Sequence, residues 1–539
     1  MPTLKFNKKE LISLVGKKID DKDLIKIIHS LKPNVENISE DEVEIEMTSD
    51  RIDYFCIEGL ARAIRSYIGI NNPKLRISKP KLDIIKEDVP VRPYIGCAVI
   101  RNLRMTEDLI RSLMNTQEVI HETYGRKRKK VAIGLHDLDK IKGEIKYIGV
   151  KREEKFVPLG ENTEMSLLDI LAKTEKGRKY GEIIYNANKW PVFCDELGIF
   201  SFPPILNSER TKITSNTRNI FIDVTGIDKT AVNKVLNLFS MIFIERGAEV
   251  EAVKIKGNYT EVTPDFTEKA FEISLEKVEK ILGIRFKEDE IVRFLEKMDY
   301  DAKISKGKII AIVKPYRFDI ISDYDIIEDI AISYGYENFE PSLPNVFTIG
   351  EIHPIERISN KVREVLVGFG FQEIVRPILT NPHLQFEKMN IPREETIRIV
   401  NPVSELYTEL RKWLLPSLMD FLSKNTKEDY PQRIFELGDV VIKDNKSETK
   451  SRNIRKVCGV IAENKSLYSE VKAIVIAISK ILGKDIIFEE TNHPTFIHGR
   501  VAKIIENGKE IGIFGEINPI VLENFKIYMP VAAFEMSLE

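Results

Sequence analysis

Apolar residues recur along this chain at two spacings, one typical of helices and one typical of strands. Near the N-terminus, four apolar residues are spaced as on one face of a helix: Leu24, Ile27, Ile28 and Leu31. Further along, three apolar residues alternate with acidic ones, as in a half-buried strand: Val43, Ile45 and Met47. A further helix is predicted over residues 56–67. Residues 1–75 are therefore predicted to form a small module in the order helix, helix, strand, helix.

The same order of elements returns in residues 268–342. Three segments of the first module align with three of the second: Leu14–Gly16 with Ile281–Gly283, Arg51–Asp53 with Arg317–Asp319, and Glu58–Ala61 with Glu328–Ala331. Repetition of this kind predicts two related modules that arose by duplication. A chance resemblance between two short units of helices and strands is the alternative.

Two larger domains are predicted between and after these modules. Residues 90–263 alternate strands with helices, which predicts an αβ domain. Its strands and helices are expected at residues 96–100 and 131–134, and at 106–123 and 229–246. Residues 350–539 begin with an amphipathic helix and continue with strands around residues 371–375, 440–442 and 512–514. The chain is thus predicted to be a multidomain protein of the α/β and α+β classes.

Composition narrows the class of protein. The chain has 539 residues, too many for a single core, and 43% of them are hydrophobic. Its net charge of −2 provides no overall attraction to nucleic acid, so any RNA contact must be local. The 4 cysteines form no C-x-x-C pair, which argues against a zinc site or a disulfide framework. Because there is also no apolar leader and no membrane-length apolar run, a cytoplasmic protein without a membrane segment is expected.

Acidic residues gather in the second module. On a helical projection, Asp325, Glu328 and Asp329 lie opposite an apolar stripe, together with Ile332, and Asp319 lies just upstream. Hard cations such as Mg²⁺ bind carboxylate oxygens, so these four acids are the candidate metal ligands. The alternative is that Asp325 belongs to a capping box and that first-turn acids complement the helix dipole.

A dense basic run occupies residues 125–130. Arg126, Lys127 and Arg128 are candidates for contact with an RNA backbone, because such contacts are electrostatic and carry little sequence information. A solvated loop between a helix and a strand is the equal alternative. His136 follows at the end of the next strand, where a core or loop histidine is expected rather than a catalytic one.

Two segments are typical of rigid turns on either side of a strand. They are Ser201–Ser208, with the sequence SFPPILNS, and Asn219–Gly226, with the sequence NIFIDVTG. Taken alone, the asparagines and threonine in such segments satisfy backbone groups.

Three of these segments resemble phenylalanyl-tRNA synthetase beta subunits of the archaeal or eukaryotic type. Residues 316–338 are similar to the family pattern P-x-x-R-x-D-I…D-x-I-E-[DE]-x-A…G-Y, and the two turn segments are similar to its S-F-P-P and D-[VI]-T-G elements. The resemblance runs in order through the whole chain. It implies two related winged-helix-like modules, an editing-type αβ domain and a class II synthetase-like domain with an antiparallel sheet. It also implies neither an inserted oligonucleotide-binding domain nor an anticodon-binding domain of the bacterial kind.

The resemblance implies ATP-dependent attachment of phenylalanine to tRNA(Phe) by a tetramer of two alpha and two beta subunits. ATP, phenylalanine and the aminoacylation site would lie on alpha, so no catalytic residue for ligation is expected in this chain. The beta chain would supply a scaffold, tRNA contacts, and a Mg²⁺ site shared with alpha at Asp319, Asp325, Glu328 and Asp329. It would also hydrolyse tyrosyl-tRNA(Phe), because a hydrophobic pocket cannot strongly reject an analogue that merely adds a hydroxyl.

The resemblance makes Asn207, Ser208, Asp223 and Thr225 the candidate residues of this editing pocket. In the C-terminal domain, Gly515–Asn518 follows the last glycine-rich strand without the arginine that a working class II site needs. That domain is therefore expected to be an inactive scaffold, with His493 and His498 as structural residues. A free-standing RNA-binding adaptor and an aminoacyl-tRNA hydrolase are the alternative functions.

Overall fold

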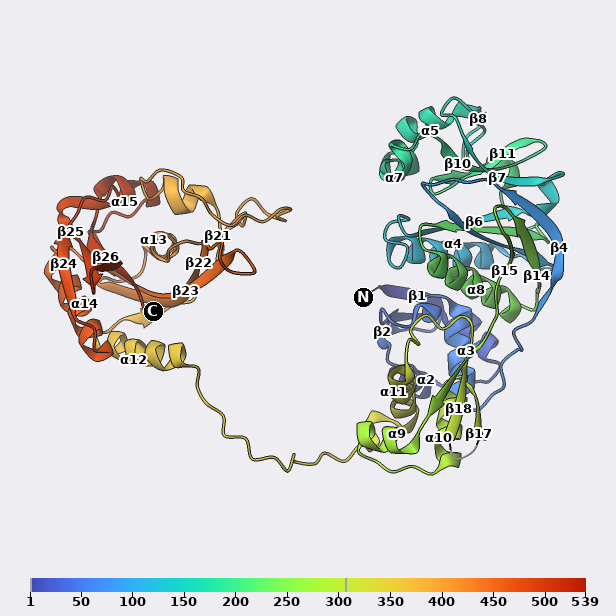
Figure 1. Ribbon diagram of the computed structural model, residues 1–539, viewed down its shortest axis with the longest axis horizontal. Helices are drawn as coiled ribbons and strands as arrows, with labels where there is room; N and C mark the ends of the chain where they lie inside the picture. The colour runs from blue at the N-terminus through green and yellow to red at the C-terminus, as the bar shows by residue number, and fades with distance from the viewer. Residues whose placement is uncertain (1, 306–307) are drawn as a thin grey trace. The chain divides into compact units, whose positions relative to one another are not determined.

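The computed structural model describes residues 2–305 and 308–539, and the chain divides into two compact units (Figure 1). The first unit comprises residues 1–342 and the second residues 343–539. Each hydrophobic cluster lies within one unit or the other, so each unit has its own core. Within the described residues, none of the helices combines the length and the apolar character needed to cross a membrane.

The N-terminal module packs helices against a small antiparallel sheet. Its elements are β1 (Thr3–Asn7), α1 (Lys8–Val15), α2 (Asp21–Ser30), β2 (Asn34–Ile38), β3 (Glu42–Glu46) and α3 (Ile57–Tyr67). The central strand β3 carries the predicted alternation, and its apolar residues are buried. The edge strands β1 and β2 are absent from the prediction. Both strands have 5 residues and are mostly exposed. β1 alternates only over Leu4 and Phe6, and in β2 the apolar Val35 and Ile38 are three positions apart, so neither gives the extended alternation that identifies a half-buried strand.

The second module repeats this arrangement (Figure 1). Its elements are β16 (Lys269–Ile273), α9 (Leu275–Leu282), α10 (Glu288–Lys297), β17 (Asp301–Ser305), β18 (Lys308–Val313) and α11 (Asp323–Tyr334). Strand β18 lies between β16 and β17, as β3 lies between β1 and β2. Gly16 and Gly283 end the first helix of each module with φ of 75° and 72°, a left-handed conformation that glycine adopts without strain.

The helix caps correct the predicted alignment of α3 with α11. Cys56 caps α3 and Ser322 caps α11, and each cap follows its aspartate (Asp53 or Asp319) at the same spacing. In this register three pairs of positions correspond: Gly59 with Asp325, Arg62 with Glu328, and Ala63 with Asp329. The predicted match of Glu58–Ala61 with Glu328–Ala331 is therefore wrong by one helical turn. Apolar residues recur at every turn of a short helix, so two such helices also match when one is displaced by a turn.

The two modules contact each other through reciprocal ion pairs. Lys32 and Asp299 occupy equivalent positions after α2 and α10, with φ of 85° and 63°. Lys32 Nζ lies 2.7 Å from Glu328 Oε1, and Arg62 Nε lies 2.7 Å from Asp299 Oδ2. Because Arg62 and Glu328 are also equivalent, each pair is the counterpart of the other with the charges exchanged.

A large, mostly antiparallel sheet forms the middle of the first unit. In spatial order its main strands are β12 (Leu206–Asn207), β11 (Gly198–Phe202), β10 (Trp190–Asp195), β7 (Ile145–Val150), β4 (Ile77–Lys86), β14 (Glu249–Lys256), β5 (Tyr94–Arg101), β13 (Ile220–Gly226) and β6 (Val131–Asp137). The apolar helix α8 (Lys229–Glu245) packs on β5, β13 and β14, and α4 (Glu107–Glu122) packs on β6. Of these elements, α4, α8, β5 and β6 occupy the positions predicted for them.

The second unit is a sheet covered on both faces. Within residues 343–539 its strands run in the order β19 (Gln372–Glu373), β22 (Gln432–Lys443), β23 (Ser451–Ala462), β27 (Val531–Ser537), β26 (Lys509–Ile517), β25 (Phe496–Glu506) and β24 (Ile486–Glu490). All neighbours are antiparallel except β19 and β22. Helices α13 (Leu415–Lys424) and α15 (Pro519–Phe525) share one core with it, and α12 (Pro354–Gly368) and α14 (Tyr468–Leu482) share another.

Candidate functional site

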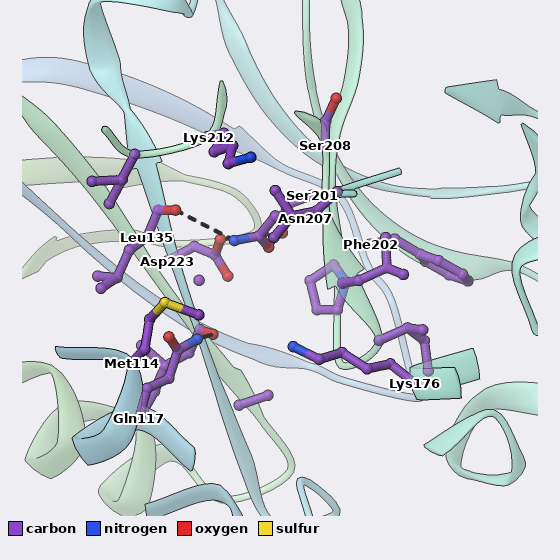
Figure 2. Close-up of a pocket in the computed structure, with 18 of the residues that line it drawn as sticks. Met114, Gln117, Leu135, Lys176, Ser201, Phe202, Asn207, Ser208, Lys212 and Asp223 are labelled. Carbon is purple, nitrogen blue, oxygen red and sulfur yellow. Dashed lines mark hydrogen bonds between the residues drawn. The ribbon is translucent and has the colours of Figure 1, made fainter. Parts of the chain in front are cut away.

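A cavity of about 660 Å³ lies in the first unit beside β6, β11, β12 and β13. Its walls are largely apolar, with a few polar groups that converge on it, as is typical of small-molecule sites. Figure 2 shows Asp223, Asn207 and Ser201 grouped in this cavity, with Met114 and Gln117 entering from α4. The segment Ser201–Ser208 therefore forms one wall, although from its sequence alone it is read only as a rigid turn.

Asp223 is the buried charge of the cavity. It lies on β13 between β5 and β6, opposite Gly134, and its side chain is only 2% exposed. A Cβ at Gly134 would lie 2.2 Å from Asp223 Oδ2, so this glycine makes the space for the carboxylate. Asp223 Oδ2 lies 3.2 Å from Ser201 Oγ, which donates to it, and 2.7 Å from His136 Nε2. The carboxylate is therefore held in place by neighbouring polar groups while still lining the cavity.

His136 supports Asp223 from behind the cavity. The imidazole is fully buried, and its Nδ1 lies 3.0 Å from the hydroxyl of Thr211. It packs edge-on against Phe200 with ring centroids 5.0 Å apart. The expectation of a buried core histidine at this position agrees with its burial. Its bond to Asp223 was not predicted, because the two residues belong to different strands of unknown register.

The other predicted pocket residues divide into two groups. Asn207 and Ser208 line the cavity. Asn207 Nδ2 donates to Leu135 O at 3.3 Å, and Ser208 Oγ donates to Val157 O at 3.0 Å. Thr225 is fully buried and is not among the described residues that line the cavity.

Arg92 explains the position of Thr225. Its buried guanidinium donates from Nε to Thr225 Oγ1 at 3.1 Å and from Nη2 to Thr225 O at 2.5 Å. Burial lowers the pKa of Arg92 to about 10. Thr225 thus holds an internal arginine, and its predicted role in the pocket stays a prediction.

The basic loop 125–130 borders the cavity through Arg128. This side chain is only 4% exposed, and its Nη1 donates to Pro204 O at 3.1 Å and to Ile205 O at 2.8 Å. Its Nη2 donates to Glu118 at 2.5 Å, and the guanidinium lies over the Tyr180 ring. Arg128 is therefore a buried wall residue of the cavity, and its predicted contact with RNA stays a prediction.

The remaining predicted residues of this loop, Arg126 and Lys127, are exposed. Arg126, Lys127 and Arg128 have φ of 50°, 53° and 64°, a left-handed conformation that costs about 1–2 kcal/mol for each such residue. The internal bonds of Arg128 hold the chain in this strained turn. As a consequence, the two neighbouring charges point to solvent beside the cavity.

Two titratable groups on α4 lie close to Arg128. Burial lowers the pKa of His121 to about 4, so the folded protein keeps this imidazole neutral at pH 7. His121 and Arg128 together lower the pKa of Glu118 to about 2. His121 Nε2 accepts a hydrogen bond from Ile133 N at 2.9 Å, which ties α4 to β6. We therefore expect this edge of the cavity to lose stability in mild acid.

The four acids of the second module do not converge on one point. Asp319 and Asp329 both pair with Arg317, whose Nη2 lies 2.5 Å from Asp319 Oδ2 and 2.6 Å from Asp329 Oδ2. Asp325 Oδ2 accepts from the amides of Ile321 and Ser322, in the predicted capping box. Glu328 pairs with Lys32.

Asp329 and Ile332 are buried, so the prediction that they face outward is wrong. The helix is covered on this side too, because the N-terminal module and Tyr300 pack against it. Burial alone would raise the pKa of Asp319, but Arg317 and then Arg51 outweigh it and hold the pKa well below its usual range. In the described residues no three His, Cys, Asp or Glu side chains are placed to hold a metal ion. The residues present therefore do not fit a preformed magnesium site.

Glu516, at the end of β26 in the second unit, lines a cavity of about 430 Å³ together with Arg500. Glu516 accepts from the amides of Leu467 and Tyr468 at 2.8 and 3.1 Å and pairs with Arg500. His493 packs against Trp413 and Phe496, and His498 bonds to Asn492. These contacts agree with a structural role for both histidines.

The comparisons with known proteins cover the whole chain. Residues 340–538 match the family model described as the phenylalanyl tRNA synthetase beta chain CLM domain, residues 271–336 match the tRNA synthetase B5 domain, and residues 101–259 match the B3/4 domain. The phenylalanine–tRNA ligase beta subunit of Pyrococcus horikoshii is 40% identical over 550 residues, covering 100% of this chain and 99% of the relative. That of Methanocaldococcus jannaschii is 38% identical over 549 residues, covering 100% of both.

A solved structure supports the fold of the first unit. The crystal structure of an N-terminal fragment of the phenylalanyl-tRNA synthetase beta subunit from Pyrococcus horikoshii is similar with a TM-score of 0.60 and 35% identity. The matched region covers 62% of this chain and 99% of the fragment. The mixed αβ, multidomain character predicted for the chain is confirmed at this level.

Proposed function

The chain belongs to the family of phenylalanine–tRNA ligase beta subunits, and on this premise we propose that it is the beta subunit of a phenylalanine–tRNA ligase. The enzyme attaches phenylalanine to tRNA(Phe) with ATP in a tetramer of two alpha and two beta subunits. The observation that carries this proposal is the match to curated beta subunits over the full length of both chains. Full-length similarity of this kind favours a synthetase subunit over a free-standing adaptor or hydrolase.

Ligation itself is assigned to the alpha subunit, which binds ATP and phenylalanine. In the second unit of this chain both faces of the sheet are covered by helices, and Glu516 pairs with Arg500 at the end of β26. Mg²⁺ acts as the ion of the ATP-dependent reaction, where nucleotide phosphates are its usual ligands. The free cysteines Cys56, Cys97, Cys194 and Cys458 support a cytoplasmic location.

The division of labour is tested by ATP–pyrophosphate exchange with purified subunits. We expect exchange from the complex of alpha and beta and none from beta alone. Robust exchange by beta alone would contradict this assignment, and failure to co-purify with an alpha subunit would favour the adaptor or hydrolase.

The large cavity is proposed as the editing site that hydrolyses tyrosyl-tRNA(Phe). Its apolar walls suit an aromatic side chain, and Asp223, Ser201 and Asn207 supply polar groups that could orient an ester and a water molecule. A site that hydrogen-bonds the tyrosine hydroxyl would spare phenylalanyl-tRNA. Phenylalanine lacks this hydroxyl, so its binding would leave the polar group of the site unpaired.

Gly134→Ala tests this editing proposal. The added Cβ would displace the carboxylate of Asp223, so we expect loss of tyrosyl-tRNA hydrolysis with unchanged ATP–pyrophosphate exchange by the complex. Gly350→Ala is the matched control, because a Cβ there meets nothing within 4 Å. Wild-type hydrolysis rates in Gly134→Ala would remove the cavity from consideration.

Arg126 and Lys127 are proposed to contact the tRNA backbone beside this cavity. Both are exposed, and Arg128 fixes the turn that carries them. Their contact would hold the acceptor strand while its aminoacyl group occupies the cavity.

A further inference from the structure

We infer that the acidic segment of the second module is a frame whose four carboxylates are already bound by donors of this chain, and that these carboxylates are not magnesium ligands. We call the group formed by Arg317, Asp319, Asp329 and Tyr300 the Arg317 frame. This inference concerns the module alone and does not depend on the proposed editing activity.

The geometry of the Arg317 frame already satisfies two of the four acids. Arg317 Nε donates to Asp319 Oδ1 at 2.9 Å and Nη2 donates to Oδ2 at 2.5 Å, which is a two-pronged pair. The same Nη2 reaches Asp329 Oδ2 at 2.6 Å, and Tyr300 Oη donates to that oxygen at 2.6 Å. A metal ion between these carboxylates would have to displace a buried guanidinium.

The other two acids also have donors of their own. Asp325 Oδ2 accepts from Ile321 N at 2.8 Å and from Ser322 N at 2.7 Å, so it caps α11. Glu328 reaches across the module interface to Lys32 at 2.7 Å. To gather all four acids, a cation would have to break a cap, an interface ion pair and the Arg317 frame together.

The first module shows that the arginine–aspartate pair belongs to the module fold. Arg51 Nε donates to Asp53 Oδ1 at 3.0 Å and Nη2 donates to Oδ2 at 2.7 Å, as in the second module. Gly59 and Ala63 stand at the positions of Asp325 and Asp329, so no acidic cluster accompanies this pair. The arginine–aspartate pair therefore forms in the first module without an acidic cluster beside it.

Binding of Mn²⁺, followed by electron paramagnetic resonance, tests the inference with a cation that shares the oxygen ligands of Mg²⁺. We expect the full-length chain to bind no Mn²⁺ with a dissociation constant below about 1 mM. In the complex with alpha, wild type and the exposed-site variant Glu328→Gln should bind equal numbers of Mn²⁺ ions. Loss of one ion per beta chain in Glu328→Gln would overturn the inference.

Thermal unfolding of the same proteins provides a second readout. The midpoint of the wild-type chain should be the same in EDTA and in millimolar MgCl₂, and a fall in EDTA would overturn the inference. Arg317→Gln and its matched control Arg51→Gln should each lower the midpoint by roughly 5–10 °C. MgCl₂ should restore part of the loss only in Arg317→Gln, because only that change leaves two carboxylates facing each other. If Arg317→Gln does not fold, the Mn²⁺ titrations still decide the question.

Discussion

Asp223 in the cavity and Asp329 in the Arg317 frame are both nearly inaccessible carboxylates, at 2% and 3% exposure. Asp223 is held by a serine hydroxyl and an imidazole and lines open space. Asp329 is held by a guanidinium and a tyrosine hydroxyl and lines none of the cavities described. A buried acid beside space can meet a ligand, whereas a buried acid beside an arginine stabilises the fold. The following changes test that distinction.

The largest effect is expected from the buried ion pair between the modules. Arg62→Met removes the arginine from Asp299 and from the buried carboxylate of Glu245, so the free energy of unfolding should fall by about 3–5 kcal/mol. Lys32→Met at the equivalent but more exposed pair should cost less than about 1 kcal/mol. Urea unfolding of the full chain measures both. Equal losses would show that burial does not distinguish the two pairs.

Asp223→Asn should reduce tyrosyl-tRNA(Phe) hydrolysis by about 10²-fold or more, because the charge beside the substrate is lost while the shape is kept. Asp329→Asn should show the opposite pattern, with lower stability and an unchanged hydrolysis rate per folded molecule. Single-turnover hydrolysis and unfolding curves on both variants provide the comparison. Similar behaviour of the two variants would contradict the distinction between a site and a frame.

Mild acid should destabilise the edge of the cavity before it affects the Arg317 frame. The unfolded chain protonates His121 near its ordinary pKa of 6.5, whereas the folded chain resists until about 4. The free energy of unfolding should therefore fall as pH is lowered between these values, by at most roughly 3 kcal/mol from this group. Asp319, whose pKa is depressed, stabilises the folded chain at pH values above the ordinary carboxyl pKa. This stabilisation is lost as pH falls from that value through the lowered pKa.

A pH series of urea unfolding curves measures this window. His121→Gln should flatten the curve, since its amide oxygen can still accept from Ile133 N without binding a proton. An unchanged slope in His121→Gln would assign the acid sensitivity to another group.

The smallest effect is expected from the basic loop. The double change Arg126→Gln with Lys127→Gln should weaken tRNA(Phe) binding by roughly tenfold. It should also reduce the slope of log K against the logarithm of salt concentration by about 1–2, because each phosphate contact releases counterions. Lys79→Gln with Lys81→Gln on β4 removes the same charge from another exposed segment and is the control. Filter binding at several salt concentrations distinguishes a specific contact from the loss of net charge.

The sequence predicts the elements whose apolar residues have a clear period. The helices α4 and α8, the strands β5 and β6 and the duplicated modules are all present where they are expected. The edge strands β1 and β2 escape prediction because each has 5 residues with only two apolar ones, too few to show a clear period. The shift of α3 against α11 escapes because only the caps fix the register of such short helices.

The candidate site residues likewise differ in how far local sequence predicts their surroundings. Asp223, Asn207 and Ser208 were found through a resemblance, and the structure places all three at one cavity. The burial of Thr225, Arg128 and Asp329 escapes prediction because their partners are distant in sequence: Arg92, the carbonyls of Pro204 and Ile205, and Tyr300. His136 was correctly expected in the core, yet its bond to Asp223 depends on strand register that no local pattern contains.

The exchanged charges of the two modules have a consequence for which copies can associate. Two copies of the first module, joined in the same geometry, would bring Lys32 against Arg62 twice, and two copies of the second would bring Asp299 against Glu328 twice. Both assemblies would set like charges face to face, which is unfavourable where solvent is excluded. Only the unlike couple compensates its charges, so these ion pairs favour association of the first module with the second over association of two like modules.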